Sequence, residues 1–157
     1  MKKLFGLLLM LLSFTGFANA NTTLNNIQLK DINNNTVTLE QYKGKNLYVK
    51  MWASWCPICL SGMPEINELS AEQNKNFNVI TIVSPGHRGE KSKEAFIEWY
   101  KGLEYKNIIV LLDENGEVIK KARVRGYPSN LILDAELNLK KTIPGHLSSE
   151  QIKQMFK

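Results

Sequence analysis

The only two cysteines of this 157-residue chain, Cys56 and Cys59, form a C-x-x-C pattern. They follow an apolar run over residues 47–52 and precede a segment with helical periodicity. A cysteine at the start of a helix faces unpaired backbone N–H groups and the positive end of the helix dipole, and both favour the thiolate. A C-x-x-C at a strand-to-helix transition is typical of a redox motif. We therefore predict that Cys56 is a nucleophile whose pKa lies below the ~8.5 of a free thiol.

Cys59 is predicted to be the second member of the redox pair. It lies one helical turn after Cys56, so both side chains face the same side. The thiolate is the attacking species in thiol–disulfide exchange, and Cys59 is placed to resolve the mixed disulfide that Cys56 forms. Pro57 fits the first helical position, where its missing N–H costs nothing. The Cys56–Cys59 disulfide is the only redox group that we expect, with no further cofactor and no metal.

The first twenty residues have the pattern of a secretory signal peptide. Lys2 and Lys3 are followed by an apolar run over residues 4–12 and by a small-x-small site at residues 18–20. We predict cleavage after Ala20 and a single domain over residues 21–157, in the periplasm or secreted. The alternative is an uncleaved anchor, but the apolar run is short for a bilayer span. No cysteine lies near Ala20, so we expect no lipid attachment there.

Charge and cysteine count narrow the function classes. Without the two lysines of the leader, the chain has 18 basic and 15 acidic residues, a net charge of +3. The basic residues are dispersed, so nucleic acid is not an expected partner. A structural staple is disfavoured because two cysteines three residues apart close no useful entropic loop. A metal carrier using both cysteines with His87 and His146 stays open, although the spacing fits no compact zinc pattern.

The elements that must position the cysteines alternate between strands and helices. Short strands at residues 27–29 and 36–39 predict an N-terminal hairpin. Apolar runs and helical periodicity predict further strands at 46–52, 77–83, 108–112, 130–134 and 137–143, and helices at 57–74 (kinked at Pro64), 91–103, 117–124 and after Ser148. Such alternation predicts an α/β three-layer sandwich, and the last hairpin makes its central sheet mixed.

Three segments carry a family resemblance. Residues 52–59 (WASWCPIC) resemble the thioredoxin active site, Tyr127-Pro128 resembles that family's cis-proline, and Gly145 its late glycine. The resemblance implies a thioredoxin fold, here with an added N-terminal hairpin, and points to the exported TlpA-like branch. Residues 53–61 (ASWCPICLS), 84–86 (SPG), 99–103 (WYKGL) and 127–129 (YPS) are similar to the N-terminal domain of the fused periplasmic methionine sulfoxide reductase.

This likeness implies a reductant. In the fused reductase that domain re-reduces the attached reductase domains and takes electrons from a membrane protein of the DsbD type. We expect a free-standing version that passes electrons to a methionine sulfoxide reductase or another oxidised exported protein. Ile58 supports this direction, because a cation there would stabilise the thiolate and make the disulfide a strong oxidant. A reductase for apocytochrome c thiols and a disulfide-forming oxidase remain alternatives.

The resemblance also assigns roles to residues around the cysteines. Trp55, Tyr127 and Pro128 would contact an extended substrate segment, with the Tyr127 backbone presented by a cis bond. Lys50, six residues before Cys56, stands where ordinary thioredoxins carry a buried acid. Either it lies near the sulfurs and lowers a thiol pKa, or it extends to the surface. Three other residues are weaker candidates, with solvated positions favoured: Glu65, His87 and Arg88.

Overall fold

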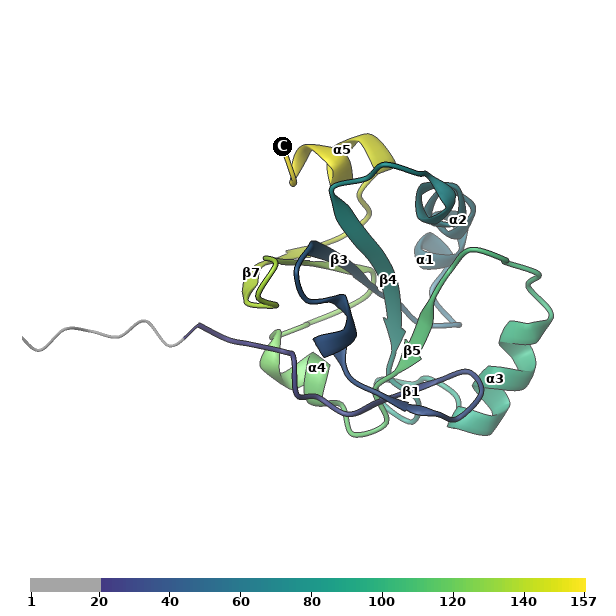
Figure 1. Ribbon diagram of the computed structural model, residues 1–157. Coiled ribbons are helices and arrows are strands. Elements are labelled where there is room, and N and C mark those ends of the chain that lie inside the picture. Colours follow the sequence, from purple (N-terminus) through teal and green to yellow (C-terminus); the bar gives the residue numbers. More distant parts are fainter. Residues whose placement is uncertain (1–20) are drawn as a thin grey trace, which may run out of the picture.

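A mixed seven-stranded sheet organises residues 21–157, which are the residues described by the computed structural model (Figure 1). The strand order is β2-β1-β5-β4-β3-β6-β7. The strands are β1 (Leu29–Asp31), β2 (Thr36–Val37), β3 (Asn46–Met51), β4 (Phe77–Val83), β5 (Val110–Leu112), β6 (Ser129–Leu133) and β7 (Leu139–Pro144). The predicted leader lies outside the described residues, so its cleavage stays a prediction.

The pairing of the strands confirms the mixed sheet. β4 runs parallel to both β3 and β5, whereas β6 is antiparallel to β3 and β7 is antiparallel to β6. The predicted N-terminal hairpin is confirmed too, because β1 and β2 pair antiparallel and β1 joins the free edge of β5. The apolar runs of β3 and β4 therefore occupy the centre of the sheet, as expected of strands buried on both faces.

Helices cover both faces of this sheet and complete the three layers (Figure 1). One face carries α1 (Pro57–Ser61), α2 (Met63–Ala71), α3 (Lys93–Lys101) and α5 (Ser149–Gln154), and the other carries α4 (Glu117–Lys121) and the 3₁₀ turn η1 (Leu39–Tyr42). Among residues 21–157, no helix is long and apolar enough to cross a membrane. The thioredoxin fold expected from the sequence is confirmed.

The helix after the cysteines differs from its prediction. The sequence indicates one kinked helix over residues 57–74, but the chain forms two helices that meet at Gly62. Pro64 lies in the first turn of the second helix, where its missing N–H leaves no carbonyl without a partner. The proline therefore starts a new helix where a kink was expected, and the active-site helix has only five residues.

Other helix boundaries differ by a few residues. The second predicted helix begins later, after Ser92, whose side chain accepts a hydrogen bond from the Ala95 N–H. The last helix begins after Ser148, as predicted, and has a capping box in which Ser148 and Gln151 exchange side-chain to backbone hydrogen bonds. These caps satisfy N–H groups that helix starts leave without a partner.

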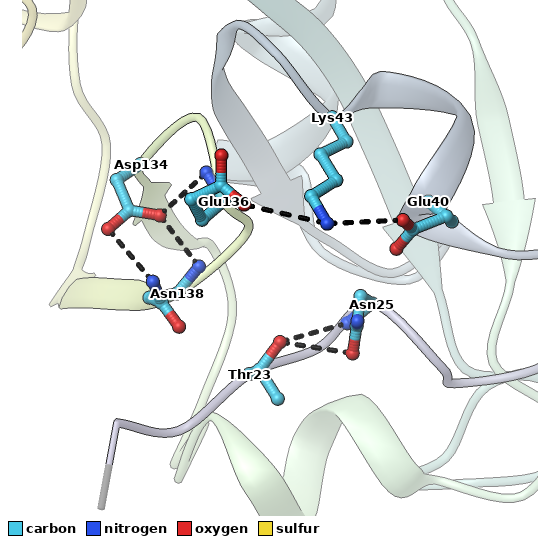
Figure 2. A network of polar contacts seen from close by, with 7 residues as sticks. All are labelled: Thr23, Asn25, Glu40, Lys43, Asp134, Glu136 and Asn138. Atoms are coloured by element: carbon cyan, nitrogen blue, oxygen red, sulfur yellow. Dashed lines mark hydrogen bonds and ion pairs between the residues drawn. The ribbon is translucent and has the colours of Figure 1, made fainter.

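The turn between β6 and β7 is organised by Asp134 (Figure 2). Its carboxylate accepts hydrogen bonds from the N–H groups of Glu136 and Asn138 at 3.0 and 2.9 Å, and from the Asn138 side chain at 3.1 Å. The same figure shows Lys43 between Glu40 and Glu136, at 3.4 and 3.5 Å. These contacts tie the last hairpin to η1.

Replacing Asp134 with alanine should weaken this hairpin. Partial burial alone would raise its carboxyl pKa, but the Lys140 ammonium and the Asn138 hydrogen bonds hold that pKa at about 2. A depressed pKa stabilises the fold above the unfolded value, and that contribution is lost as pH falls towards 2. We expect Asp134→Ala to lower the free energy of unfolding at pH 7 by about 1–2 kcal/mol. Urea titrations of both proteins at pH 7 and pH 2 check this, since the difference between the two proteins should shrink at pH 2.

Candidate active site

The two cysteines form a disulfide at the start of α1, with their Cα atoms 5.2 Å apart. Cys56 is the residue that precedes the helix, and its Sγ accepts a hydrogen bond from the Cys59 N–H at 3.2 Å. The same N–H can stabilise a thiolate on Cys56 in the reduced protein. Cys56 is 4% exposed and Cys59 is fully buried. Only Cys56 can therefore be reached by an incoming sulfur.

Strand β3 and its continuation deliver the cysteines to the surface. The Trp52 N–H bonds to the Ile82 carbonyl, which extends the strand pairing by one residue, and a turn from Ala53 to Cys56 follows. The Trp52 ring is fully buried, and its centroid lies 5.7 Å from that of Phe96. Trp52 is therefore a core residue, and it anchors the base of the active-site loop.

An apolar surface surrounds the outer sulfur. Trp55 and Ile58 flank Cys56 in the sequence, and they are 50% and 60% exposed. The Trp55 and Tyr127 ring centroids lie 6.1 Å apart, although the two residues are 72 positions apart in the sequence. Large apolar side chains that lie together at a protein surface indicate a contact surface. No charged side chain stands between the two cysteines.

The proline segment lies beside this surface. Ser129 pairs with Met51 at the end of β3, so Pro128 stands next to the strand end from which the cysteine loop departs. The Tyr127–Pro128 bond is cis, as the resemblance implied. The Gly145 N–H donates to the Pro128 carbonyl at 2.9 Å, and Gly145 has a φ of +92°, which favours glycine. The late glycine therefore supports the proline segment from the neighbouring strand.

Lys50 does not reach the surface, so the surface alternative is wrong. Its side chain is fully buried, and its Nζ has no hydrogen-bond partner among the described residues. Side chains alternate along a strand, so Lys50 shares a face of β3 with the buried Tyr48. A Cβ built on Gly62 would lie 3.3 Å from Lys50 Nζ and 3.1 Å from the His146 ring. The break between α1 and α2 therefore leaves room for these two groups.

The charge of Lys50 is disfavoured by its surroundings. Burial lowers the pKa of the Lys50 ammonium, and the Glu65 carboxylate opposes that shift only in part. Glu65 itself accepts a hydrogen bond from the Ser149 N–H at 2.6 Å and lies 3.8 Å from His146 Nε2. Glu65 is therefore more than the solvated helix residue that the sequence favoured, because it also fixes the start of α5.

The loop after β4 borders the site, whereas the sequence favoured a solvated loop. Arg88 donates from its guanidinium to the Val124 and Arg125 carbonyls at 2.7 and 2.9 Å. His87 Nε2 lies 2.9 Å from the Glu114 carbonyl oxygen. A Cβ on Gly89 would lie 3.6 Å from Trp55 Nε1. The loop is thus held against both the cysteine loop and the proline segment.

Glu90 is the site residue that sequence reasoning missed. It is 7% exposed, and its carboxylate accepts hydrogen bonds from both the N–H and the hydroxyl of Ser54, the latter at 2.6 Å. Lys91 also bonds to this pair, through its N–H to Glu90 and through its ammonium to Ser54 Oγ. One glutamate in a loop of charged and small residues gives no sequence signal of burial.

The metal-carrier alternative requires both cysteines, His87 and His146 to lie together. Within residues 21–157, no group of three or more His, Cys, Asp or Glu side chains converges as metal ligands. His87 belongs to the loop after β4, while His146 lies beside Glu65 and α2. The two histidines therefore contact other parts of the chain than the cysteines do. The cysteine pair itself has one accessible and one buried sulfur, which is the arrangement of an exchange site.

Comparison with known proteins agrees with this arrangement. Residues 19–155 match the family model described as Redoxin. An uncharacterized protein of Haemophilus influenzae is 68% identical over 153 residues, 98% of this chain and 97% of that protein. The thiol-disulfide oxidoreductase ResA of Geobacillus thermodenitrificans is 29% identical over 94% of this chain and 87% of its own. The exposed lipoprotein thioredoxin Etrx1 of Streptococcus pneumoniae superposes with a TM-score of 0.78 at 44% identity, over 82% of this chain and 95% of that one.

Proposed function

Because this chain belongs to the redoxin family and is a thioredoxin-like thiol–disulfide oxidoreductase, we propose that it is an exported reductant of disulfides in other exported proteins. The observation that carries the direction is the apolar surface around Cys56. Ile58 lies between the cysteines, is 60% exposed and carries no charge. A cation there would stabilise the thiolate and make the pair oxidising. Without one, the reduced pair gives up its electrons more readily.

The reaction follows from the unequal exposure of the two sulfurs. The Cys56 thiolate attacks one sulfur of the partner's disulfide, and the partner's other sulfur leaves as a thiolate. Cys59 then loses its proton and attacks Cys56 Sγ, which releases the partner's second thiolate and forms the Cys56–Cys59 disulfide. Two electrons pass to the partner, so this pair must be reduced again by a donor.

The acceptor we propose is a methionine sulfoxide reductase, oxidised to a disulfide by its own catalytic cycle. The resemblance of residues 84–86, 99–103 and 127–129 to the N-terminal domain of the fused reductase supports this choice. An extended segment of the partner would lie across Trp55, Tyr127 and Pro128, with its backbone paired to that of Tyr127. A membrane protein of the DsbD type would supply the electrons, after removal of the predicted leader.

Lys50 enters this proposal as a group that tunes thiol ionisation. It is a buried cation on the strand that leads into the cysteine loop, next to the helix break one turn after Cys59. A positive charge near a thiol favours the thiolate. Burial at the same time lowers the pKa of the Lys50 ammonium.

The reduction potential of the Cys56–Cys59 pair tests the direction. We expect a value near the ~−270 mV of thioredoxin in equilibrium with a dithiothreitol series, because Ile58 places no charge between the two cysteines. Ile58→His should move the potential towards more oxidising values, by about 30 mV or more. Turnover of an oxidised methionine sulfoxide reductase by the wild-type protein tests the acceptor. A wild-type value near ~−120 mV would contradict the proposal and indicate a disulfide-forming oxidase.

A further inference from the structure

The loop after β4 connects two parts of the site that are distant in the sequence. Its residues 84–91 follow directly after β4, and β4 lies beside β3 in the sheet. Ser84 donates to Asp113 at 3.3 Å, His87 contacts the Glu114 carbonyl and Arg88 contacts the Val124 and Arg125 carbonyls. At its other end, Glu90 holds Ser54. The same short loop therefore touches the cysteine loop and the segment that leads into Pro128.

The Glu90 contact acts on the turn that carries the nucleophile. Ser54 is two residues before Cys56 and lies inside the turn from Ala53 to Cys56. By accepting from both donors of Ser54, the Glu90 carboxylate fixes the backbone and the side chain of this residue together. Hydrogen bonds to a charged acceptor are about twice as strong as neutral ones. A carboxylate that is 7% exposed also incurs a desolvation cost, which indicates a specific requirement for it here.

Lys91 supplies the compensating charge. Its backbone N–H donates to Glu90 Oε1 at 2.7 Å, and its ammonium donates to Ser54 Oγ at 2.8 Å. The ammonium also lies 5.3 Å from the centroid of the Trp99 ring, a cation–π distance. The hydroxyl of Ser54 thus donates to an anion and accepts from a cation. The buried polar groups of Ser54 and Glu90 therefore all have partners, and such networks rigidify the segment that they hold.

The Arg88 contacts hold the segment that leads into Pro128. Its two guanidinium nitrogens reach the carbonyls of Val124 and Arg125, which come four and three residues before Pro128. Arg88 itself has a φ of +50°, a left-handed conformation that non-glycine residues adopt rarely. Side chains held by several contacts on both sides of a reacting centre keep its geometry fixed, and small displacements there reduce rates strongly.

We propose that residues 84–91 form a bracket that sets the distance between the nucleophile and the substrate-binding proline segment, with Glu90 and Arg88 as its positioning residues. Glu90 acts through Ser54 on Trp55 and Cys56, and Arg88 acts through the carbonyls before Tyr127. Neither residue takes part in bond making. The inference rests on the exchange activity of the proposed function, but not on its direction or on the identity of the partner.

Glu90→Gln tests the contact between the bracket and the cysteine loop. Glu94→Gln, on the exposed first turn of α3, is the matched control. The amide keeps the shape but presents an N–H₂ group towards one of its donors. We expect the amide of Ser54 to exchange its hydrogen at least about tenfold faster, while central amides of β3 and β4 keep their rates. We also expect kcat/KM for a disulfide-bonded peptide to fall about tenfold, mainly in kcat. The control variant should match the wild type in both measurements.

Arg88→Met tests the contact between the bracket and the segment that leads into Pro128. Arg123→Met, at an exposed arginine, is its control. Amide chemical shifts should change at residues 124–127 without a change in Ser54 exchange, whereas Glu90→Gln should give the reverse pattern. Loss of protection throughout the sheet in Glu90→Gln, or a kcat/KM equal to that of Glu94→Gln, would overturn the bracket. If the wild-type protein exchanges with no disulfide at all, the proposed function fails, and the hydrogen-exchange pattern still decides the bracket.

Discussion

Replacing Cys56 with serine is expected to abolish disulfide exchange, while replacing Cys59 with serine is expected to trap the partner. Cys56 is the only cysteine with any exposure, since the other cysteine of the chain, Cys59, is fully buried. Without Cys56 no sulfur can attack the partner. Without Cys59 the first attack still takes place, but the mixed disulfide has no nucleophile to resolve it.

The size of the two effects follows from the geometry of the pair. Cys59 lies three residues from Cys56, and its attack on Cys56 Sγ is intramolecular, with a high effective concentration. We expect turnover to fall by at least about 10³-fold in either variant. The variants then differ in their products, because only Cys59→Ser should accumulate a covalent complex. Non-reducing electrophoresis with an oxidised methionine sulfoxide reductase separates the two cases.

The control is the double variant Cys56→Ser/Cys59→Ser, which should form no complex with any disulfide. Cys59→Ala should trap the partner as Cys59→Ser does, since the missing thiol and not the new hydroxyl is responsible. A Cys59→Ser protein that forms no mixed disulfide with the reductase, yet forms one with oxidised glutathione, would remove this reductase as the acceptor. No adduct with either would contradict the exchange mechanism.

Lys50→Met should stabilise the protein and slow its reaction at the same time. Lys50 Nζ is buried without a hydrogen-bond partner among the described residues, and burial lowers the pKa of its ammonium. A buried ammonium without a full set of partners costs free energy, which a methionine of similar length does not. We expect the free energy of unfolding at pH 7 to rise by about 1–3 kcal/mol.

The lowered pKa of Lys50 also predicts how the stability of the protein changes with pH. The pKa of Lys50 is lower in the folded chain than its unfolded value of 10.5, so the unfolded chain binds more protons between these two values. The stability of the wild-type protein should therefore rise with pH across that interval. Below the folded pKa the full cost of the buried charge is present, and above 10.5 it disappears. Lys50→Met should remove this slope, which urea titrations from pH 6 to pH 10 can follow.

The reaction should change in the opposite direction. If Lys50 favours thiolate formation, its loss raises the thiol pKa and slows alkylation of the reduced protein by iodoacetamide at pH 7. We expect a fall of about threefold to tenfold in that rate. Lys101→Met, at an exposed lysine near the end of α3, is the matched control for both measurements. A Lys50→Met protein that is less stable, or that alkylates at the wild-type rate, would contradict the assigned role.

Several features of this protein could be predicted from the sequence because they depend on neighbours along the chain. The two cysteines are one helical turn apart, the helix start follows an apolar strand, and Ser148 and Gln151 cap the last helix three residues apart. Apolar runs, and alternation in the N-terminal hairpin, identified the strands to within two residues of their observed ends. The boundary that failed, between α1 and α2, lies where Gly62 and Pro64 together end one helix and begin another.

The remaining features were decided only by the tertiary structure. Alternation places Lys50 on one face of β3, but its burial depends on the helix break at Gly62 and on His146, which comes 96 residues later. The contact between Glu90 and Ser54 joins residues 36 apart. It exists because β4 lies beside β3, and no local periodicity specifies the order of strands in a sheet. The sequence by itself therefore determined which two sulfurs form the pair, whereas the packing of distant segments determined what holds them in place and which charged groups lie near them.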